Sequence, residues 1–394
     1  MKKVVAISVV VLTALVGAYI LWSAQGRTAA AAKPELFLDD TSSFGVDSGS
    51  GNLVAVQPYM QTKDYASAEA YHAKLDGYLA AAQAQGWLHP DTVVVFPELH
   101  STWLVAANEK EGLYEAETLE EGMQIMVTSN LPAFLKAYTE ARGQDKIADS
   151  IFRMKADWVS QVYQETFSSL AENYGVTIVA GSLFLPEPEV QNGRLVLGDG
   201  DLQNVTAVFR PDGSLYPNLV RKIIMTPAER PIASAGDPNQ QLTFDTPAGN
   251  LGVLICADSW YLEPYDTLTA QKPDFIVVPN NYYTEGGWDA IWQGPDPGPP
   301  PGDVDSDDIG RITEGEARLK YTLGGRMETT GAKTGMHVFS GGKLWDMNMT
   351  GHTLIFTDEG IIEASPDARG AVVNYWLPER DSQSVIQYND APDN

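Results

Sequence analysis

The sequence predicts a layered α/β domain built around two β-sheets. One observation is a set of short, almost continuously apolar and β-branched runs, such as residues 91–100 and 176–185, which are typical of strands buried on both faces. A second observation is that such runs alternate with longer segments of helical periodicity, as in strand–helix–strand units. A third is turn chemistry between alternating runs in residues 202–223 and 242–260, which predicts two hairpins.

The composition is that of a globular protein with a large core, because 44% of the 394 residues are hydrophobic. Asp and Glu outnumber Lys and Arg by 52 to 26, which gives a formal net charge of −26. This excess argues against a surface that binds nucleic acid or anionic lipid. We therefore expect no nucleic-acid partner.

Residues 1–32 predict an export segment. Lys2 and Lys3 precede an uninterrupted apolar stretch over residues 4–22, which approaches the roughly 20 residues that span a bilayer. The segment therefore fits a single-helix membrane anchor, and the small residues at 28–32 fit a cleaved signal peptide equally well. In both cases the two lysines predict a cytoplasmic N-terminus, with the rest of the chain periplasmic or secreted.

The first half of the predicted fold follows a polar linker at residues 33–52, which ends in "DSGSGN" and is expected to be flexible. Apolar runs define the strands, and spaced Leu, Tyr and Ala residues define the helices. In chain order these are a strand at 53–60, a helix at 65–85, a strand at 91–100, helices at 131–141 and 147–174, and a strand at 176–185.

The second half begins with the two hairpins, the first of which carries "PDG" at residues 211–213. The same patterns then predict a helix at 264–271, a strand at 274–282, a helix at 313–330, and strands at 336–342, 353–364 and 371–376. Residues 282–316 are rich in Pro, Gly and aromatic residues and predict a lid-like insertion. Residues 379–394 predict a polar tail.

Cys256 is the single cysteine of the chain, so no internal disulfide can form in a compartment that would permit one. It ends the apolar run of "GVLICADSW", where a lone Cys is either a small buried hydrophobe or a nucleophile. Glu98 ends another buried run, and Lys222 is flanked by apolar residues in a strand. A buried Lys needs a partner, and ligands gather at the carboxyl ends of strands.

Three segments, "FPEL" around Glu98, "RKI" around Lys222 and "GVLICAD" around Cys256, occur in this order along the chain. Together they resemble the signature segments of the nitrilase, or carbon–nitrogen hydrolase, superfamily. "DFIVVPNN" and "GRMETTGAKTGMHVFSGG" resemble the elements that follow the nucleophile there. The resemblance implies a four-layer αββα sandwich over residues 53–378, paired with further copies in a homodimer or higher oligomer.

The resemblance also implies roles for individual residues. Cys256 would be the nucleophile, Glu98 the general base and Lys222 the electrostatic stabiliser, and Glu229 would be a second, positioning glutamate. The chemistry fits the side chains, since a Cys with a pKa near ~8.5 needs a base to become a thiolate. The N–H of Ala257 is a candidate second donor to the oxyanion, and Asp258 is a candidate helix cap.

Several neighbouring residues are candidates for the pocket wall or for ordinary packing: His100, Trp260, Tyr282 and Trp288. A calcium loop is a further candidate, because Asp303, Asp305, Asp307 and Glu314 occupy ligand positions of a twelve-residue pattern. Its sixth position holds Asp308 where the sharp turn needs Gly, so a solvated acidic loop is the alternative. No cofactor is expected.

The predicted function is that of an exported or membrane-anchored thiol hydrolase, which cleaves the C–N bond of a small-molecule amide or nitrile. Two alternatives stay open. An acyltransferase would pass the acyl group from Cys256 to an amine, and a non-catalytic scaffold would keep the fold without the chemistry. The sequence leaves the substrate and the fate of the N-terminal segment undecided.

Overall fold

The computed structural model describes residues 2–27, 34–283, 287–295 and 300–379. Its centre consists of two large β-sheets. One has the spatial order β1 (Asp40–Phe44), β18 (Ala371–Trp376), β2 (Asn52–Gln57), β4 (Thr92–Val95), β5 (Thr177–Pro186), β8 (Leu202–Phe209) and β9 (Val220–Arg221). The other has the order β10 (Thr243–Thr246), β11 (Gly249–Val253), β12 (Phe275–Pro279), β13 (Thr334–Val338), β16 (Thr353–Thr357) and β17 (Gly360–Ala364).

The remaining elements cover or extend these sheets. Small sheets are formed by β15 (Met347–Met349), β14 (Gly341–Leu344) and β3 (Tyr59–Gln61), and by β6 (Glu189–Gln191) and β7 (Arg194–Val196). The helices are α1 (Lys2–Ala24), α2 (Ala68–Ala84), α3 (Glu111–Glu115), α4 (Leu119–Ser129), α5 (Leu131–Glu140), α6 (Lys146–Arg153), α7 (Ala156–Tyr174), α8 (Leu262–Gln271), α9 (Glu314–Tyr321) and α10 (Leu323–Thr330).

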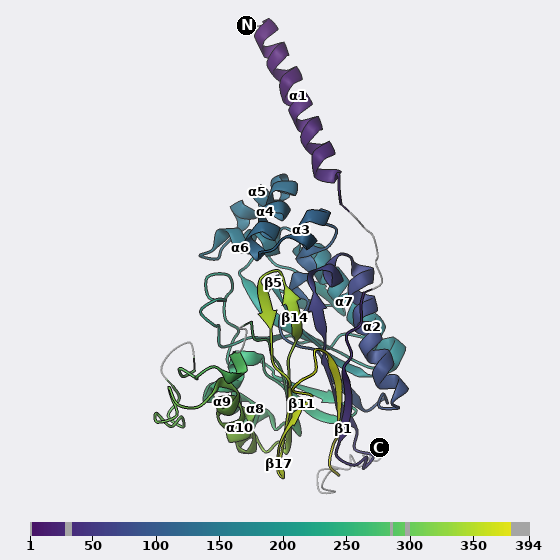
Figure 1. Cartoon of the computed structure of the whole chain (residues 1–394), viewed down its shortest axis with the longest axis vertical. Coiled ribbons are helices and arrows are strands. Elements are labelled where there is room, and N and C mark those ends of the chain that lie inside the picture. Colours follow the sequence, from purple (N-terminus) through teal and green to yellow (C-terminus); the bar gives the residue numbers. More distant parts are fainter. Residues whose placement is uncertain (1, 28–33, 284–286, 296–299, 380–394) are drawn as a thin grey trace, which may run out of the picture.

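The two faces of the first sheet belong to two different hydrophobic cores. Val54 and Val56 of β2 pack in one core with α2 and α7, whereas Leu53 and Ala55 pack in the other with Val253 and other residues of the second sheet. Alternate residues of a strand point to opposite faces, so the sheets pack against each other and each is covered by helices on its outer side. Figure 1 shows α2 and α7 on one side of the sheets and α8, α9 and α10 on the other, which confirms the predicted layered fold.

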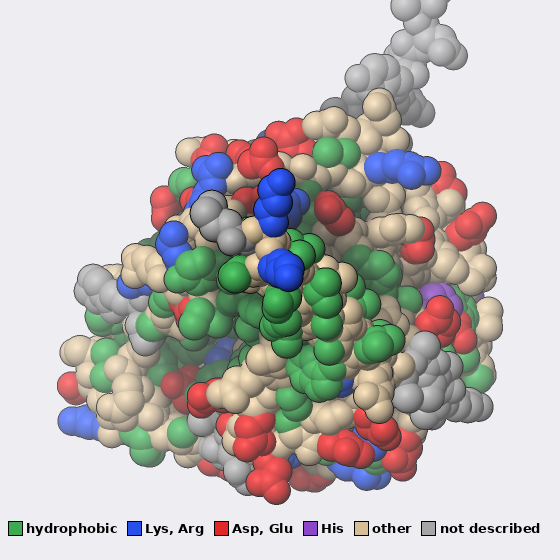
Figure 2. All heavy atoms as spheres, turned by 90° about the horizontal axis from the view of Figure 1, so that it is seen from above, with side chains coloured by type: hydrophobic (Ala, Val, Ile, Leu, Met, Phe, Trp, Pro, Cys, Tyr) green, Lys and Arg blue, Asp and Glu red, His purple; other side chains and the backbone are tan. Residues whose placement is uncertain are grey.

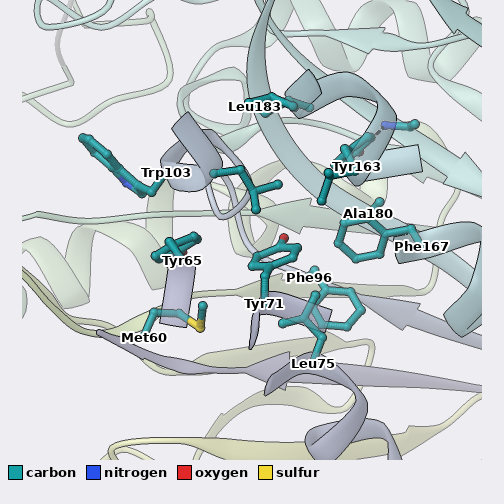
Figure 3. Packing of buried hydrophobic residues seen from close by; sticks show 14 of the residues in the cluster. Met60, Tyr65, Tyr71, Leu75, Phe96, Trp103, Tyr163, Phe167, Ala180 and Leu183 are labelled. Carbon is teal, nitrogen blue, oxygen red and sulfur yellow. Dashed lines mark hydrogen bonds between the residues drawn. The ribbon is translucent and has the colours of Figure 1, made fainter. Parts of the chain in front are cut away.

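Aromatic side chains fill the core between the first sheet and its helices (Figure 3). The Phe96 and Phe167 rings meet edge to face with centroids 5.2 Å apart, and Tyr163 contacts Phe167 in the same way at 5.1 Å. Such pairs add about 0.5–1.5 kcal/mol each beyond their buried area. Aromatic packing therefore helps to hold the segment that leads from β4 to Glu98.

The segment expected to be a flexible linker contains a strand. β1 pairs in parallel with β18 at the edge of the first sheet, and Arg369 holds Asp39 with two hydrogen bonds, of 2.9 and 2.8 Å. The expectation of a linker through residue 52 is thus corrected. The sequence "DTSSF" gave no hydrophobic signal, because an edge strand is held by backbone hydrogen bonds and needs little burial.

Two predicted helices are each divided. The expected helix at 147–174 breaks between α6 and α7, where Lys155 has a non-helical conformation and its ammonium group contacts Ala107 O and Glu109. The expected helix at 313–330 breaks at Thr322, between α9 and α10. A side chain that satisfies a distant buried acid imposes such a break, and local periodicity does not reveal it.

Helices α3 to α6 form a cap at the end of the molecule from which α1 projects (Figure 1). They lie in the chain between β4 and β5, and the sequence patterns did not predict α3 and α4. Helix α1 has 23 residues with a mean hydropathy of 2.7 and no buried side chain. By length and composition it could cross a membrane.

Candidate active site

Glu98 lies in a loop that is closed onto both sheets. Its backbone N–H donates to Asn280 O at 3.2 Å, and its side chain is 2% exposed. The loop approaches β5 at a bulge, where Gly181 has a φ of +64° and a Cβ would lie 2.1 Å from Pro97 O. Glycine is needed there because any side chain would displace the Pro97–Glu98 peptide.

Lys222 joins Glu98 to Glu229. Its Nζ donates to Glu98 Oε1 at 2.7 Å and to Glu229 Oε2 at 2.6 Å, and its side chain is 1% exposed. Asn204 on β8 donates its amide to the same two carboxylates, at 3.0 Å and 2.7 Å. Thr226 donates to Glu229 from both its backbone N–H and its hydroxyl. Two acids and one base thus share one buried hydrogen-bond network.

The shared lysine affects the two carboxylates differently. Burial raises the pKa of Glu98 above its ordinary range, and the Lys222 charge offsets this only in part. Burial also opposes ionisation of Glu229, but the Lys222 charge and the hydrogen bonds from Lys222, Thr226 and Asn204 lower its pKa below the ordinary range. Burial disfavours the Lys222 ammonium, yet the two glutamates raise its pKa well above the usual value. The Lys222 charge and the surrounding hydrogen bonds thus favour the ionised form of Glu229, whereas burial favours the protonated form of Glu98.

Cys256 lies at the carboxyl end of the second sheet, in the first position of a 3₁₀ helix, η3 (Cys256–Trp260), with a φ of 45°. A left-handed backbone is uncommon for a residue with a side chain and is found at functional sites. The thiol is buried and lies 3.9 Å from Asn281 O. Burial and, to a smaller extent, the Glu98 charge raise the pKa of the Cys256 thiol to about 12, against the opposing charges of Lys222 and Arg318.

The Asp258 carboxylate accepts hydrogen bonds that link the segment containing Lys222 to the turn containing Cys256. Its Oδ1 accepts the N–H groups of Ile223 and Ile224 at 2.9 and 2.7 Å, and its Oδ2 accepts the Ile255 N–H at 3.2 Å. The last contact is the local capping that the sequence predicts, and the first two extend the role of this residue. Burial raises the pKa of Asp258 to about 7.

The structure brings Glu98, Lys222 and Glu229 into contact, and the Cys256 thiol, with Ala257 and Asp258 following it in η3, lies against Asn281 O. Sequence reasoning missed Asn204 and Asn281. The amide of Asn281 donates to Glu98 O at 3.2 Å, so this residue contacts both the base segment and the thiol. Each Asn follows an apolar or β-strand pattern, and nothing local distinguishes it from an ordinary polar residue.

The four pocket candidates have different surroundings. His100 does not line an entrance: its ring is buried between aromatic rings, stacked on Phe96 at 5.9 Å, and burial lowers its pKa to about 3. Trp260 is stacked on Trp292 at 5.8 Å beneath α9. Tyr282 lies beside the site with its ring 4.9 Å from the Arg318 guanidinium. Trp288 packs against His352, 4.4 Å away.

The calcium candidate is not assembled. Asp303 is turned toward Arg326, which donates to it at 2.9 and 3.0 Å, while Asp305 accepts the Asp307 N–H. Among the described residues, no group of three His, Cys, Asp or Glu side chains converges. The residue at the glycine position, Asp308, binds Lys320 instead. The sharp turn that gathers calcium ligands is therefore missing.

A large cavity lies away from this cluster. It has a volume of about 760 Å³ and is lined by residues of α5, α6 and the following turn, among them Lys136, Arg142 and Arg153. It contains no nucleophile. The thiol and its acid–base network therefore define the candidate active site.

Comparisons with known proteins agree with this geometry. The sequence profile of the carbon-nitrogen hydrolase family matches residues 53–302. A mutant amidase from Nesterenkonia sp. AN1, with the acetamide moiety of fluoroacetamide covalently added at its active-site cysteine, has a TM-score of 0.51 at 12% identity, covering 85% of this chain and 94% of that chain. A double mutant of that amidase in complex with acrylamide has a TM-score of 0.50 at 13% identity with the same coverage. No curated protein sequence matches the chain. At these identities the structural likeness concerns the fold.

Proposed function

The chain belongs to the carbon-nitrogen hydrolase family, and on that premise we propose that it hydrolyses an amide of a small molecule through a thioester on Cys256. The observation that carries the proposal is the buried network in which Lys222 contacts Glu98 at 2.7 Å and Glu229 at 2.6 Å, with the Cys256 thiol near enough for the charges of these three groups to act on its pKa. A scaffold protein has no need of such a network, because it leaves a thiol, two acids and a base buried together at a cost in stability.

In the first half of the reaction, Cys256 Sγ attacks the amide carbonyl carbon. The thiol proton moves to Glu98, whose raised pKa suits it to accept this proton. The Lys222 ammonium and the Ala257 N–H stabilise the oxyanion, and losing one such donor commonly lowers the rate by about 10²–10³. Glu98 then protonates the leaving nitrogen, the C–N bond breaks, and ammonia or an amine departs.

In the second half, water replaces the departed amine. Glu98, again a carboxylate, takes a proton from the water, and the resulting hydroxide attacks the thioester carbonyl. The C–S bond breaks, and the proton on Glu98 returns to the Cys256 sulfur. Glu229 stays ionised throughout and holds Lys222 in place, because its lowered pKa keeps it a carboxylate.

We further propose that α1 holds the enzyme at a membrane with its catalytic domain outside the cytoplasm, as a homodimer or higher oligomer. Support for the anchor comes from the 23-residue length of α1, from its mean hydropathy of 2.7 and lack of buried side chains, and from the lysines at its start. Support for the oligomer comes from the family resemblance. Protease protection in sealed vesicles and light scattering of the purified full chain test these two points.

The test of the activity is release of ammonia or amine by the detergent-solubilised full chain over a panel of amides and nitriles. Cys256→Ser keeps nearly the same side-chain size and is the matched control. Release by the parent and none by the variant supports the proposal. Absence of release together with a thiol that resists small alkylating agents contradicts it. A reactive thiol without hydrolysis, followed by product formation when an amine is added, assigns acyl transfer instead.

A further inference from the structure

Arg318 on α9 is a buried cation, and no hydrogen bond or ion pair joins its Nε or Nη1 to the residues that the structure describes. The residue is 4% exposed. The other buried arginine nearby, Arg326, is satisfied by Asp303 and by Ser259 O. An unpaired buried guanidinium is costly, so its retention calls for an anion that the described residues do not supply.

The guanidinium of Arg318 is held among aromatic rings beside the nucleophile. Its Cζ lies 5.3 Å from the Trp260 ring, 4.9 Å from the Tyr282 ring and 5.6 Å from the Phe339 ring. Trp260 closes the same 3₁₀ helix that begins with Cys256, and Tyr282 follows the residue whose carbonyl contacts the thiol. The positive charge of Arg318 lowers the pKa of the Cys256 thiol and so opposes the effect of burial.

One acid lies near this cation without pairing to it. Glu314 is one turn earlier on α9; burial raises its pKa and the Arg318 charge acts in the opposite direction, but no ion pair joins the two side chains. The rings flank the guanidinium, and its Nε and Nη1 are buried with no hydrogen-bond partner among the described residues. A planar fork of this kind binds carboxylate through two parallel hydrogen bonds.

We propose that Arg318 binds a carboxylate of the substrate, so that the amide cleaved by this enzyme carries a negative charge a short distance from its scissile bond. The inference rests on the proposed function for its chemistry and narrows the substrate to carboxylate-bearing small amides. It also reconciles an anionic substrate with a net charge of −26, since recognition depends on one desolvated cation and not on the overall field.

The test compares two amides of equal size, one ending in a carboxylate and the other in a neutral carboxamide. We expect the wild type to prefer the carboxylate, and Arg318→Gln to lower kcat/KM for it by about 10² or more, with a much smaller loss for the neutral amide. Lys320→Gln removes the same charge from an exposed site on the same helix and is the matched control. Equal losses on both amides, or a wild type that prefers the neutral amide, overturn the proposal.

Binding separates this proposal from the proposed activity. Calorimetric titration of the Cys256→Ala full chain with the carboxylate amide measures recognition without turnover. Binding that is lost in Cys256→Ala/Arg318→Gln and restored in part by Arg318→Lys supports the subsite, even if no hydrolysis is found. If these variants are folded, as judged by their thermal unfolding, and bind the carboxylate amide as Cys256→Ala does, the subsite is excluded.

A separate set of observations concerns the cap. Helix α1 contacts the cap through Tyr19, near the C-terminal end of the helix. Tyr19 Oη donates to Thr128 O at 3.2 Å and accepts the Leu131 N–H at 2.9 Å. The first turns of α5 therefore lie level with Tyr19, and aromatic residues near the end of a spanning helix mark the membrane interface. On one face of α5, the residues Leu131, Leu135 and Tyr138 are 41%, 53% and 41% exposed.

We infer that this face of α5 enters the outer leaflet of the bilayer that α1 spans. Figure 2 looks down α1 onto this end of the molecule, so the hydrophobic side chains at its centre include those of α1, and the acidic side chains lie mainly toward the edge. Binding depends on apolar contact, so a zwitterionic bilayer suffices in spite of the acidic surface. The inference rests on the proposed anchor.

Brominated-lipid quenching in zwitterionic nanodiscs tests this orientation on the full chain. In a Cys256→Ser background, a fluorophore is placed at Leu135→Cys, at Leu12→Cys in α1, and at the exposed Ile361→Cys in β17, at the opposite end of the molecule in Figure 1. We expect quenching at positions 12 and 135 and none at 361. Quenching at 12 without quenching at 135 refutes the inference, and absence of quenching at 12 refutes the anchor itself.

Discussion

Replacing Glu229 by Gln tests the proposal that the two glutamates have different roles, Glu98 as the base and Glu229 as the counter-ion of Lys222. The Glu229 carboxylate accepts hydrogen bonds from Lys222 at 2.6 Å, from Asn204 at 2.7 Å, and from the Thr226 N–H and hydroxyl at 3.0 and 2.9 Å. A glutamine retains one acceptor oxygen. If this oxygen takes the place of Oε2, which accepts from Lys222 and Thr226, the amide N–H groups take the place of Oε1 and face the Asn204 amide, which is itself a donor.

The expected loss of stability follows from these contacts. Removing one partner of a buried ion pair costs about 3–5 kcal/mol when the other charge is left alone. Lys222 keeps Glu98 at 2.7 Å, so it is not left alone. We therefore expect a decrease in the free energy of unfolding of about 2–3 kcal/mol, near the value of one charge-assisted hydrogen bond.

The expected change in catalysis has a definite sign. The Glu229 charge raises the pKa of Glu98, and the Lys222 charge lowers it. Removing the Glu229 carboxylate abolishes the first effect and leaves Lys222 paired to Glu98 only, so both changes lower the pKa of Glu98. A weaker base that is held in an ion pair should lower kcat/KM by about 10–100-fold, while the acid limb of the pH profile moves to lower pH.

The measurement is the pH dependence of kcat/KM for Glu229→Gln and the parent on the best amide of the panel, together with urea unfolding of both. Because Glu98 and the thiol titrate as a coupled pair, the profile is compared as a whole. Thr226→Val, which removes one hydroxyl contact and keeps the charge, is the matched control. An acid limb that stays in place or moves to higher pH in Glu229→Gln refutes the assignment of Glu229 as counter-ion.

Two further predictions concern the support of the site. His100 is held neutral by burial with a pKa of about 3, against about 6.5 when unfolded, so its stabilising effect is complete above pH 6.5 and is lost as pH falls. Between pH 7 and pH 5, the free energy of unfolding of His100→Phe should therefore fall by about 2 kcal/mol less than that of the parent, as measured by urea titration at both pH values. An equal fall in the two proteins would contradict the buried neutral ring. Gly181→Ala places a Cβ 2.1 Å from Pro97 O, and we expect kcat to fall by at least about tenfold and Tm to decrease. Gly193→Ala is the control, because a Cβ there meets no atom within 4 Å and the substitution tests the backbone strain alone. Retention of full activity in Gly181→Ala would show that the Glu98 loop does not depend on this close approach.

The elements that depend on local pattern were predicted well. The buried runs at 91–100 and 176–185 became β4 and β5, and the turn chemistry of residues 242–260 became the β10–β11 hairpin. The elements that depend on contacts with distant parts of the chain were not predicted. β1 is held by a parallel neighbour more than 300 residues away in the chain, and the break at Lys155 serves a buried glutamate.

The sequence by itself determined which residue types carry the chemistry and their order along the chain: an acid after one buried strand, a lysine in a second and one cysteine after a third. Hydrophobic periodicity and turn residues are local properties, so they predicted the strands that end at these positions. Only the tertiary structure decided that Lys222 contacts two glutamates, that Asn204 joins them, that His100 belongs to the core, and that Arg318 is left without an anion. Partners and burial arise where distant segments meet, and pKa values follow from partners and burial.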